Sequence, residues 1–262
     1  MIIRSANSTD LDAIRHLWQD CFFDPIEYID FYIKNRFEAK YCAVLEIDGE
    51  VVGMIHLLPC TIYPEEKALY WYAAGIRSDK RNQGLFKKFA KAVKEKANEL
   101  GFYNVCVPAP GLESYYQSLG FEFPYMSSDV VIEKSDENSK ITFEDGEARD
   151  FSCADFANFG NTIWSENAIQ YAIDENKYCG GKVLRFKMDE KFYCFFAIKK
   201  ENEFLIEYHN MTIEEFKKVK NAICSVLNCE TLIFRTNGKE KIVGLTDANA
   251  INSRSKITMT LA

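Results

Sequence analysis

The residues best suited to chemistry in this sequence form the run Arg81-Asn82-Gln83-Gly84-Leu85-Phe86. The run places a cation, two amide side chains and a glycine directly in front of an amphipathic stretch. If a helix begins at Leu85, its first backbone N–H groups have no partner within the helix, and the positive end of the helix dipole lies beside them. Such a loop binds anions, phosphate in particular. Gly84 has no side chain that would hold a phosphate away from these N–H groups.

Two regular elements must position this loop. The segment 69–76 is aromatic, rich in strand-forming residues and short, so it predicts a buried strand. Behind the loop, apolar residues recur at spacings of three and four and predict an amphipathic helix that ends at Gly101. The expected inward positions of this helix are Phe86, Phe89, Ala90, Val93, Ala97 and Leu100.

A second motif follows one strand later. Residues 103–107 predict a strand that Pro108 ends, and residues 112–119 predict a short helix that ends at Gly120. This helix leads into the run Tyr116-Gln117-Ser118-Leu119-Gly120-Phe121.

The two runs together resemble the signatures of the GNAT superfamily of acetyl-CoA-dependent N-acetyltransferases. Arg81 and Gly84 match its pyrophosphate-loop pattern, which is Arg or Gln, two residues, Gly, one residue, then Gly or Ala. Phe86 departs from this pattern at the last position. Tyr116 to Phe121 is similar to the Tyr-x-x-x-Gly-Phe motif that closes the GNAT core. The motifs occur in the family's order, with one helix and one strand between them.

The resemblance implies an α/β (α+β) fold with a mixed, mostly antiparallel sheet flanked by helices. It implies acetyl-CoA as the acyl donor, held partly by a central strand that splays from its neighbour near Gly75 and Ile76. The backbone N–H of Ile76 or Arg77 would polarise the thioester carbonyl. By position, Tyr116 would be the catalytic acid that protonates the departing thiolate. The implied cofactor-binding residues are Gly75, Ile76, Arg77, Arg81, Asn82, Gln83, Gly84, Leu85 and Phe86.

The reaction class is direct attack of an amine on the thioester. A Lys-like amine has a pKa of about 10.4, so a proton must be removed before attack and another delivered to the leaving thiolate. The base is open, because residues 69–76 contain no carboxylate and Glu65 and Glu66 lie upstream. Either a water chain serves, or a residue from elsewhere, including the second half of the chain. His56, a lone histidine on an expected strand, is more often structural than basic.

Several elements precede and follow these motifs. We expect a strand at 1–4, a helix capped by Thr9 and Asp12, a helix from Pro25 to about Phe37, and strands at 41–47 and 51–60 joined by an Asp48-Gly49 hairpin. Strands at 121–126 and 130–133 would complete a first domain at residues 1–135. The polar run 135–140 predicts the domain boundary.

The second half, residues 141–262, predicts a smaller α+β domain with no glycine loop. Its order is hairpin, strand, helix, strand, which echoes the first half and favours a degenerate GNAT-like repeat. At the loop position it offers His209-Asn210-Met211-Thr212, so it should not hold CoA. It would form a wall of the acceptor cleft or bind a ligand of its own. The expected elements are a helix near 161–171, strands at 182–188, 192–199, 204–208, 230–235 and 257–261, and a helix capped by Thr212 and Glu215.

The composition restricts the classes of partner that we expect. The chain has 262 residues, 47% of them hydrophobic, and a net charge of −7, which disfavours nucleic acid and mildly favours a cationic amine. Nine cysteines without a C-x-x-C pair indicate reduced thiols, with no disulfide frame and no metal site. Neither a secretion signal nor a membrane span is predicted, so we expect a cytoplasmic protein.

The leading hypothesis is therefore an N-acetyltransferase acting on a primary amine of a small molecule or a protein. The alternative is a non-catalytic module that senses acyl-CoA through the same loop, and a third hypothesis is an enzyme with a longer acyl or an aminoacyl donor. The acceptor, the acyl chain length and the oligomeric state are not specified by the sequence.

Overall fold

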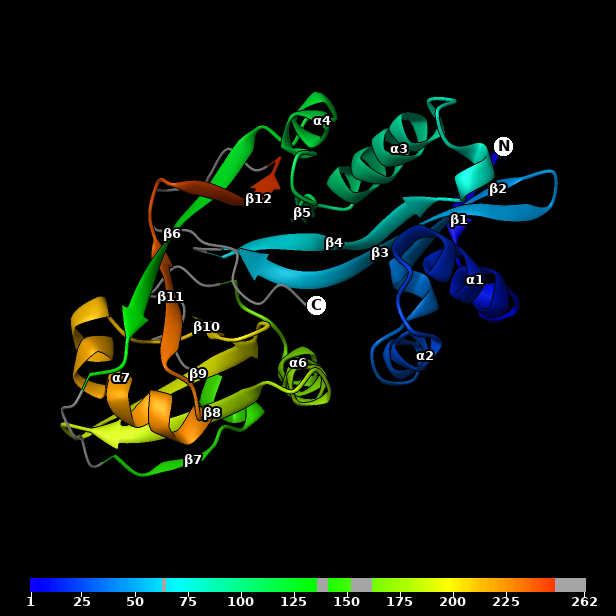
Figure 1. The fold of residues 1–262 in the computed structure, drawn as a ribbon. Helices are drawn as coiled ribbons and strands as arrows, with labels where there is room; N and C mark the ends of the chain where they lie inside the picture. The colour runs from blue at the N-terminus through cyan, green and yellow to red at the C-terminus, as the bar shows by residue number, and fades with distance from the viewer. Residues whose placement is uncertain (63–64, 136–140, 152–161, 248–262) are drawn as a thin grey trace. The chain divides into compact units, whose positions relative to one another are not determined.

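The structure is a computed structural model that describes residues 1–62, 65–135, 141–151 and 162–247. The chain forms two compact units (Figure 1). The first comprises Met1–Cys60, Glu66–Pro124 and the chain from Leu245, and the second comprises Tyr125–Gly244 with a short piece that begins at Thr61. The predicted α/β class with a mostly antiparallel sheet is confirmed.

The first unit contains a sheet in the order β1-β2-β3-β4-β5-β12. Strands β1, β2 and β3 pair antiparallel, β4 and β5 pair parallel, and the end of β12 pairs antiparallel with β5. Its elements are β1 (Ile2–Ser5), η1 (Ser8–Asp10), α1 (Leu11–Phe22), α2 (Ile26–Asn35), η2 (Ala39–Tyr41), β2 (Cys42–Ile47), β3 (Glu50–Ile62), β4 (Glu66–Ile76), η3 (Ser78–Lys80), α3 (Leu85–Glu99), β5 (Tyr103–Cys106), α4 (Glu113–Ser118) and the end of β12 (Lys241–Thr246).

Strand β4 is buried on both faces, because helices cover both sides of the sheet in this unit (Figure 1). Trp71 packs edge-on against Phe121, which follows α4, with ring centroids 5.0 Å apart. The next residue, Tyr72, points to the opposite face and packs against Trp18 of α1 at 5.5 Å. This explains why the strand is almost continuously apolar rather than alternating.

Local signals placed most elements of this unit correctly, and three details differ. The Asp48-Gly49 hairpin is confirmed, with φ of 52° and 83° at its two residues. The capping box at the first helix is Asn7 with Asp10, not Thr9 with Asp12, because the 3-10 turn η1 precedes α1. Leu100 is 62% exposed rather than inward, since α3 ends just before it. The strands predicted at 121–126 and 130–133 are one strand, β6 (Phe123–Glu133).

The second unit contains a sheet in the order β6-β11-β10-β9-β8-β7. Strands β10 and β11 pair parallel, and all other described pairs in this sheet are antiparallel. The further elements are β7 (Phe143–Asp145), η4 (Ala148–Phe151), α6 (Glu166–Tyr178), β8 (Lys182–Met188), β9 (Lys191–Lys199), β10 (Phe204–Glu207), α7 (Ile213–Leu227) and β11 (Thr231–Asn237). The strand predicted at 257–261 lies outside the described residues.

The topology of this sheet repeats that of the first unit. In each unit a helix joins the two parallel strands: α3 between β4 and β5, and α7 between β10 and β11. Three further strands continue each sheet on one side, and one antiparallel strand closes it on the other. This order supports the predicted GNAT-like repeat. The units divide at Pro124 and Tyr125, ahead of the polar run at 135–140, because β6 pairs with β11.

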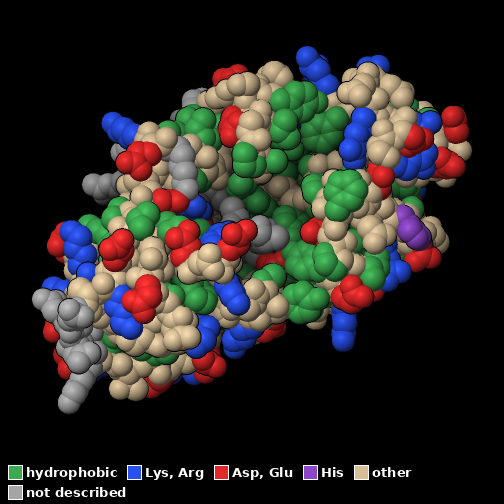
Figure 2. All heavy atoms as spheres, viewed as in Figure 1, with side chains coloured by type: hydrophobic (Ala, Val, Ile, Leu, Met, Phe, Trp, Pro, Cys, Tyr) green, Lys and Arg blue, Asp and Glu red, His purple; other side chains and the backbone are tan. Residues whose placement is uncertain are grey.

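Lys and Arg side chains are interspersed with Asp and Glu over the face shown in Figure 2. Ion pairs recur among the described residues, as where Arg185 contacts Glu144 and Asp150 at 2.7 and 3.1 Å. Of the helices in the described part of the chain, none is long and apolar enough to cross a membrane.

Candidate active site

The pairing between the parallel strands β4 and β5 ends before Gly75 and Ile76, the residues where the sequence predicts an opening. Their pairing ends at Trp71 and Cys106, whereas β4 continues to Ile76. Two residues past the last pair, Ala73 has a φ of 45°, a left-handed conformation that costs about 1–2 kcal/mol for a residue with a side chain. From Tyr72 onward β4 therefore carries backbone groups that β5 does not pair. Nothing in the sequence marks Ala73, since a residue with positive φ is usually Gly or Asn.

Gly75 and Ile76, both predicted cofactor contacts, lie on the part of β4 that β5 does not pair. A Cβ atom at Gly75 would lie 2.7 Å from Cys21 Sγ, so the glycine lets α1 approach the strand closely. The carbonyl oxygen of Ile76 accepts a hydrogen bond from Arg81 Nε at 2.9 Å. Gly75 thus has a packing role that the sequence did not indicate, and Arg81 is oriented by the strand that precedes its loop.

Arg77 has a different role from the predicted one. Its backbone N–H already donates to the carbonyl oxygen of Val52 at 2.8 Å, so it is not free to polarise a thioester carbonyl. Its guanidinium pairs with Asp79 at 2.7 Å and with Glu50 at 3.0 Å, and these hydrogen bonds raise the pKa of Arg77. Arg77 therefore anchors the loop, and the predicted oxyanion contact is left to Ile76.

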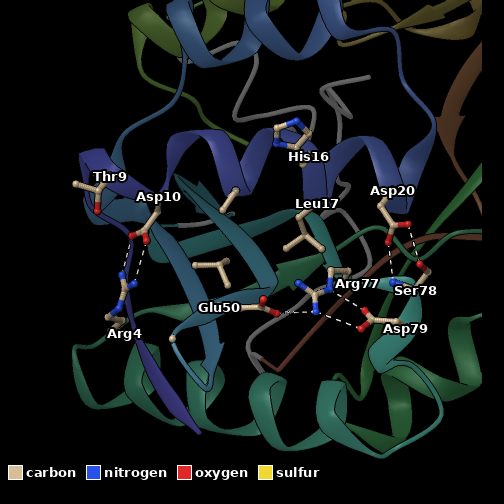
Figure 3. A pocket seen from close by; sticks show the side chains of 13 residues that line it. Arg4, Thr9, Asp10, His16, Leu17, Asp20, Glu50, Arg77, Ser78 and Asp79 are labelled. Carbon is tan, nitrogen blue, oxygen red and sulfur yellow. Dashed lines mark hydrogen bonds and ion pairs between the residues drawn. The ribbon is translucent and has the colours of Figure 1, made fainter.

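Asp20 of α1 holds the start of the loop (Figure 3). Its carboxylate accepts hydrogen bonds from the backbone N–H and the hydroxyl of Ser78, at 2.6 and 2.8 Å. These bonds lower the pKa of Asp20. The residues line a polar cavity of about 750 Å³ together with Glu50 and Arg77. Sequence reasoning missed Asp20, because nothing local to it predicts a partner on a distant loop.

The loop itself has the geometry of an anion site. Asn82 and Gly84 adopt positive φ values of 61° and 69°, and α3 begins at Leu85 without a side-chain cap. The first intrahelical bond described at this end runs from Lys88 N–H to the carbonyl of Gly84, so the preceding N–H groups face outward. A Cβ atom at Gly84 would meet nothing within 4 Å, so the backbone conformation, and not crowding by the protein, is what favours glycine.

The remaining predicted loop residues surround this helix end. Arg81, Asn82 and Gln83 are exposed, while Leu85 and Phe86 are half-buried. The amide of Gln83 contacts the carbonyl of Asp79 at 3.5 Å. The structure thus brings Arg81 to Phe86 together around the uncapped helix end. Among the residues that the structure describes, no cluster of His, Cys, Asp and Glu is suited to a metal ion.

Tyr116 lies on α4, next to the first turn of α3. Its ring contacts Phe121 at 5.8 Å and Phe86 at 6.3 Å, measured between centroids. Burial raises the pKa of Tyr116, and the neighbouring Cys106 and Tyr115 add to this effect. The phenol therefore carries its proton at neutral pH.

The Gly-Phe pair of the motif fixes α4 to the core. Gly120 has a φ of 86°, and its carbonyl accepts a hydrogen bond from Lys94 Nζ of α3 at 3.0 Å. Phe121 is fully buried and packs against Trp71 of β4. The motif thus ties Tyr116 to both the helix and the central strand.

His56, which the sequence raised as a possible base, and the thiol of Cys106 are both buried. His56 is 1% exposed, and its Nδ1 atom lies 3.1 Å from the hydroxyl of Tyr32. Burial lowers the pKa of His56 to about 3, so the ring is neutral and a weak base. Cys106 is buried, and burial raises the pKa of its thiol well above the usual value.

In the second unit, side chains of that unit occupy the positions that correspond to the unpaired part of β4 and to the uncapped end of α3. Tyr208 has a positive φ of 46° two residues past the last β10–β11 pair, as Ala73 has past the last β4–β5 pair. There, Arg235 Nη1 contacts Glu207 at 3.2 Å. The N-terminus of α7 is capped by Thr212 and by the carboxylate of Glu215. An anionic side chain thus lies at the N-terminus of α7, the position that corresponds to the uncapped N-terminus of α3.

The comparisons with known proteins agree with this geometry. The acetyltransferase (GNAT) domain family matches residues 2–123. A crystal structure from Enterococcus faecalis V583, described as a probable N-acyltransferase, superposes with a TM-score of 0.72 at 12% identity, covering 94% of this chain and 72% of that one. A GCN5-related N-acetyltransferase from Kribbella flavida gives 0.69 at 12% identity, with 94% and 70% covered. One from Anabaena variabilis gives 0.67 at 11% identity, with the same coverage. No curated protein matches the chain.

The solved structures define a class of fold, that of the GNAT acyltransferases, over nearly the whole chain. The family match is more specific and covers most of the first unit. Residues 2–123 are similar to the acetyltransferase (GNAT) domain family.

Proposed function

We propose that this protein is an N-acetyltransferase that moves an acetyl group from acetyl-CoA to a primary amine of a small molecule or a protein. The observation that carries the proposal is the placement of Tyr116 beside the uncapped N-terminus of α3, through the ring of Phe86. In this arrangement the proposed phosphate site, at the start of α3, lies next to the proposed proton donor on α4. The free stretch of β4 supplies backbone groups for the pantetheine arm between them.

In this proposal the loop from Arg81 to Phe86 binds the CoA pyrophosphate, and the free part of β4 at Gly75 and Ile76 binds the pantetheine. The N–H groups at the start of α3 and the partial positive charge of the helix end stabilise the phosphates. Asp20 and Arg77 do not contact the cofactor but hold the loop in place.

The chemistry is a direct attack of the neutral amine on the thioester carbon. The C–N bond forms, the C–S bond breaks, and the electron pair leaves with the CoA sulfur. Tyr116 donates its proton to that sulfur, and the ammonium formed on the acceptor loses a proton to a base, so the charges balance.

The base is not a carboxylate of β4. Glu66 is the acidic residue of this strand, and it lies ten residues before Ile76. At about 3.3 Å per residue this separation is about 33 Å along an extended strand, too far for direct proton transfer. We propose that a water chain or a residue outside β4 serves as the base.

We also propose a role for each half of the chain and a cellular location for the protein. Residues 1–135 act as the acetyltransferase domain, and residues 141–262 form a repeat of the same topology that does not bind CoA. The described cysteines are all free thiols, which supports a cytoplasmic location.

The lack of a carboxylate in the second half of β4 favours one competing function, a module that binds acyl-CoA without turnover. The two functions share the cofactor loop and differ in the acceptor reaction. Thiol release with acetyl-CoA and a panel of amines separates them: release above the rate with acetyl-CoA alone supports the enzyme, whereas binding without release supports the sensor.

The experiment that tests the cofactor site is a calorimetric titration with acetyl-CoA of the wild type and of Gly84→Trp. The indole would fill the space in front of the α3 N-terminus, so we expect binding to be lost. The matched control is Gly101→Trp, because Gly101 has a similar φ of 80°, equally open surroundings and a position at the far end of the same helix. Equal affinity in Gly84→Trp and wild type would contradict the assigned site.

A further inference from the structure

The aromatic ring of Phe86 stands where the GNAT loop pattern has glycine or alanine, and its contacts give it a specific task. Phe86 is the second residue of α3 and follows the loop glycine directly. Its ring lies 6.3 Å from that of Tyr116, at an interplanar angle of 70°, and 6.1 Å from that of Tyr115. The residue that begins the phosphate-binding helix thus contacts the proposed catalytic acid.

The helix that carries Tyr116 needs such a contact. Helix α4 has only six residues and no side-chain cap at its N-terminus, and isolated helices of this length are not stable in water. Lys94 and the buried Phe121 hold its C-terminal end. The ring of Tyr116 also contacts the rings of Phe86 and Tyr115.

We propose that Phe86 is a positioning residue for Tyr116: together with Phe121 it packs against the phenol ring and so holds its hydroxyl toward the CoA sulfur. This inference rests on the proposed function. Because Phe86 lies in the first turn of α3, binding of the pyrophosphate at that turn also fixes the ring that holds Tyr116. Donor binding and placement of the acid are therefore coupled through one side chain.

A double-mutant cycle tests the proposal. The readout is thiol release from acetyl-CoA, with either water or the fastest amine of the panel as the acetyl acceptor. Contacting residues that act together are non-additive, so Phe86→Ala should lower kcat about tenfold in the wild type and less than about twofold in a Tyr116→Phe background. The KM for acetyl-CoA should change by less than about threefold, because removing a side chain from the first turn keeps its backbone N–H groups. Phe86→Leu, which restores bulk, should recover most of the rate.

The control is Phe89→Leu, one turn further along α3, where the ring is buried and lies near Gly53 rather than Tyr116. The fold-reductions in kcat caused by Phe89→Leu and by Tyr116→Phe should multiply in the double variant. If Phe86→Ala is as harmful in the Tyr116→Phe background as in the wild type, Phe86 acts only through the stability of the fold and the proposal is wrong. If Tyr116→Phe alone leaves kcat unchanged, the proposed acid itself is wrong, which is a separate result.

Discussion

Asp20 on α1 and Ser78 on the loop after β4 are joined by two hydrogen bonds, although 58 residues separate them in the sequence. The carboxylate accepts both the backbone N–H and the hydroxyl of Ser78. This pair connects the helix on one face of the sheet to the loop that we assign to the CoA pyrophosphate. The same loop contains two residues with positive φ values, Asn82 and Gly84.

Removing this connection should weaken cofactor binding without touching the cofactor. A hydrogen bond to a charged group contributes about 1.5–3 kcal/mol, so Asp20→Ala should raise the Kd for acetyl-CoA by roughly tenfold or more. Calorimetric titration checks this. Asp12→Ala, an exposed acidic residue on the same helix, is the control and should bind like the wild type. An unchanged Kd for Asp20→Ala would show that the loop needs no anchor.

Acid should destabilise the fold through Asp10. The hydrogen bonds from Arg4, at 2.6 and 2.9 Å, lower the pKa of this buried carboxyl below its unfolded value. A carboxylate with a depressed pKa stabilises the folded state above the unfolded pKa of about 3.9 and loses that contribution as the pH falls through the folded pKa. Urea unfolding should therefore show Asp10→Asn about 1–2 kcal/mol less stable than wild type at pH 7, with the gap narrowing below about pH 4. A gap that is constant with pH would refute this assignment.

Gly120 should tolerate no side chain. It combines a φ of 86° with a position where a Cβ atom would overlap the ammonium of Lys94. Gly120→Ala should lower the free energy of unfolding by more than the roughly 1–2 kcal/mol expected from the left-handed conformation alone, and it should slow thiol release because α4 shifts. Gly101→Ala has a similar φ and open surroundings, so it measures the conformational cost by itself. Equal losses in the two variants would mean that Lys94 moves aside.

The second unit should not bind acetyl-CoA. Titration of the wild type should give one equivalent per chain, since α7 is capped by Thr212 and Glu215. Thr212→Ala should cost about 1 kcal/mol of stability, the usual value of an N-cap, while leaving the Kd for acetyl-CoA unchanged. A stoichiometry of two would contradict the view that this repeat has lost the cofactor site.

What the sequence could predict depended on how local each signal was. The Asp48-Gly49 hairpin, the Thr212–Glu215 capping box and the amphipathic face of α3 are each specified by residues a few positions apart, and all three are found. The opening of β4 was predicted through family resemblance, whereas the positive φ of Ala73 that accompanies it has no marker in the sequence.

The features that sequence reasoning missed are long-range. Strand β12 pairs with β5 through Leu245 and Thr246, across about 140 residues of sequence. No local sequence pattern predicts such a distant partner. Arg77 was assigned to the cofactor through its backbone N–H, but the bond of this N–H to Val52 and the side-chain partners Glu50 and Asp79 become visible only in the folded chain. The contact of Phe86 with Tyr116 likewise joins two helices whose spacing the sequence does not give.

The central claim is that Tyr116 protonates the departing thiolate, and the most direct test is the Tyr116→Phe variant. Thiol release from acetyl-CoA should fall by about 100-fold or more, as expected for the loss of a general acid, while the calorimetric Kd for acetyl-CoA stays within about threefold of wild type. The phenylalanine keeps the ring packing against Phe121 and removes only the hydroxyl. Unchanged thiol release in this variant would contradict the account.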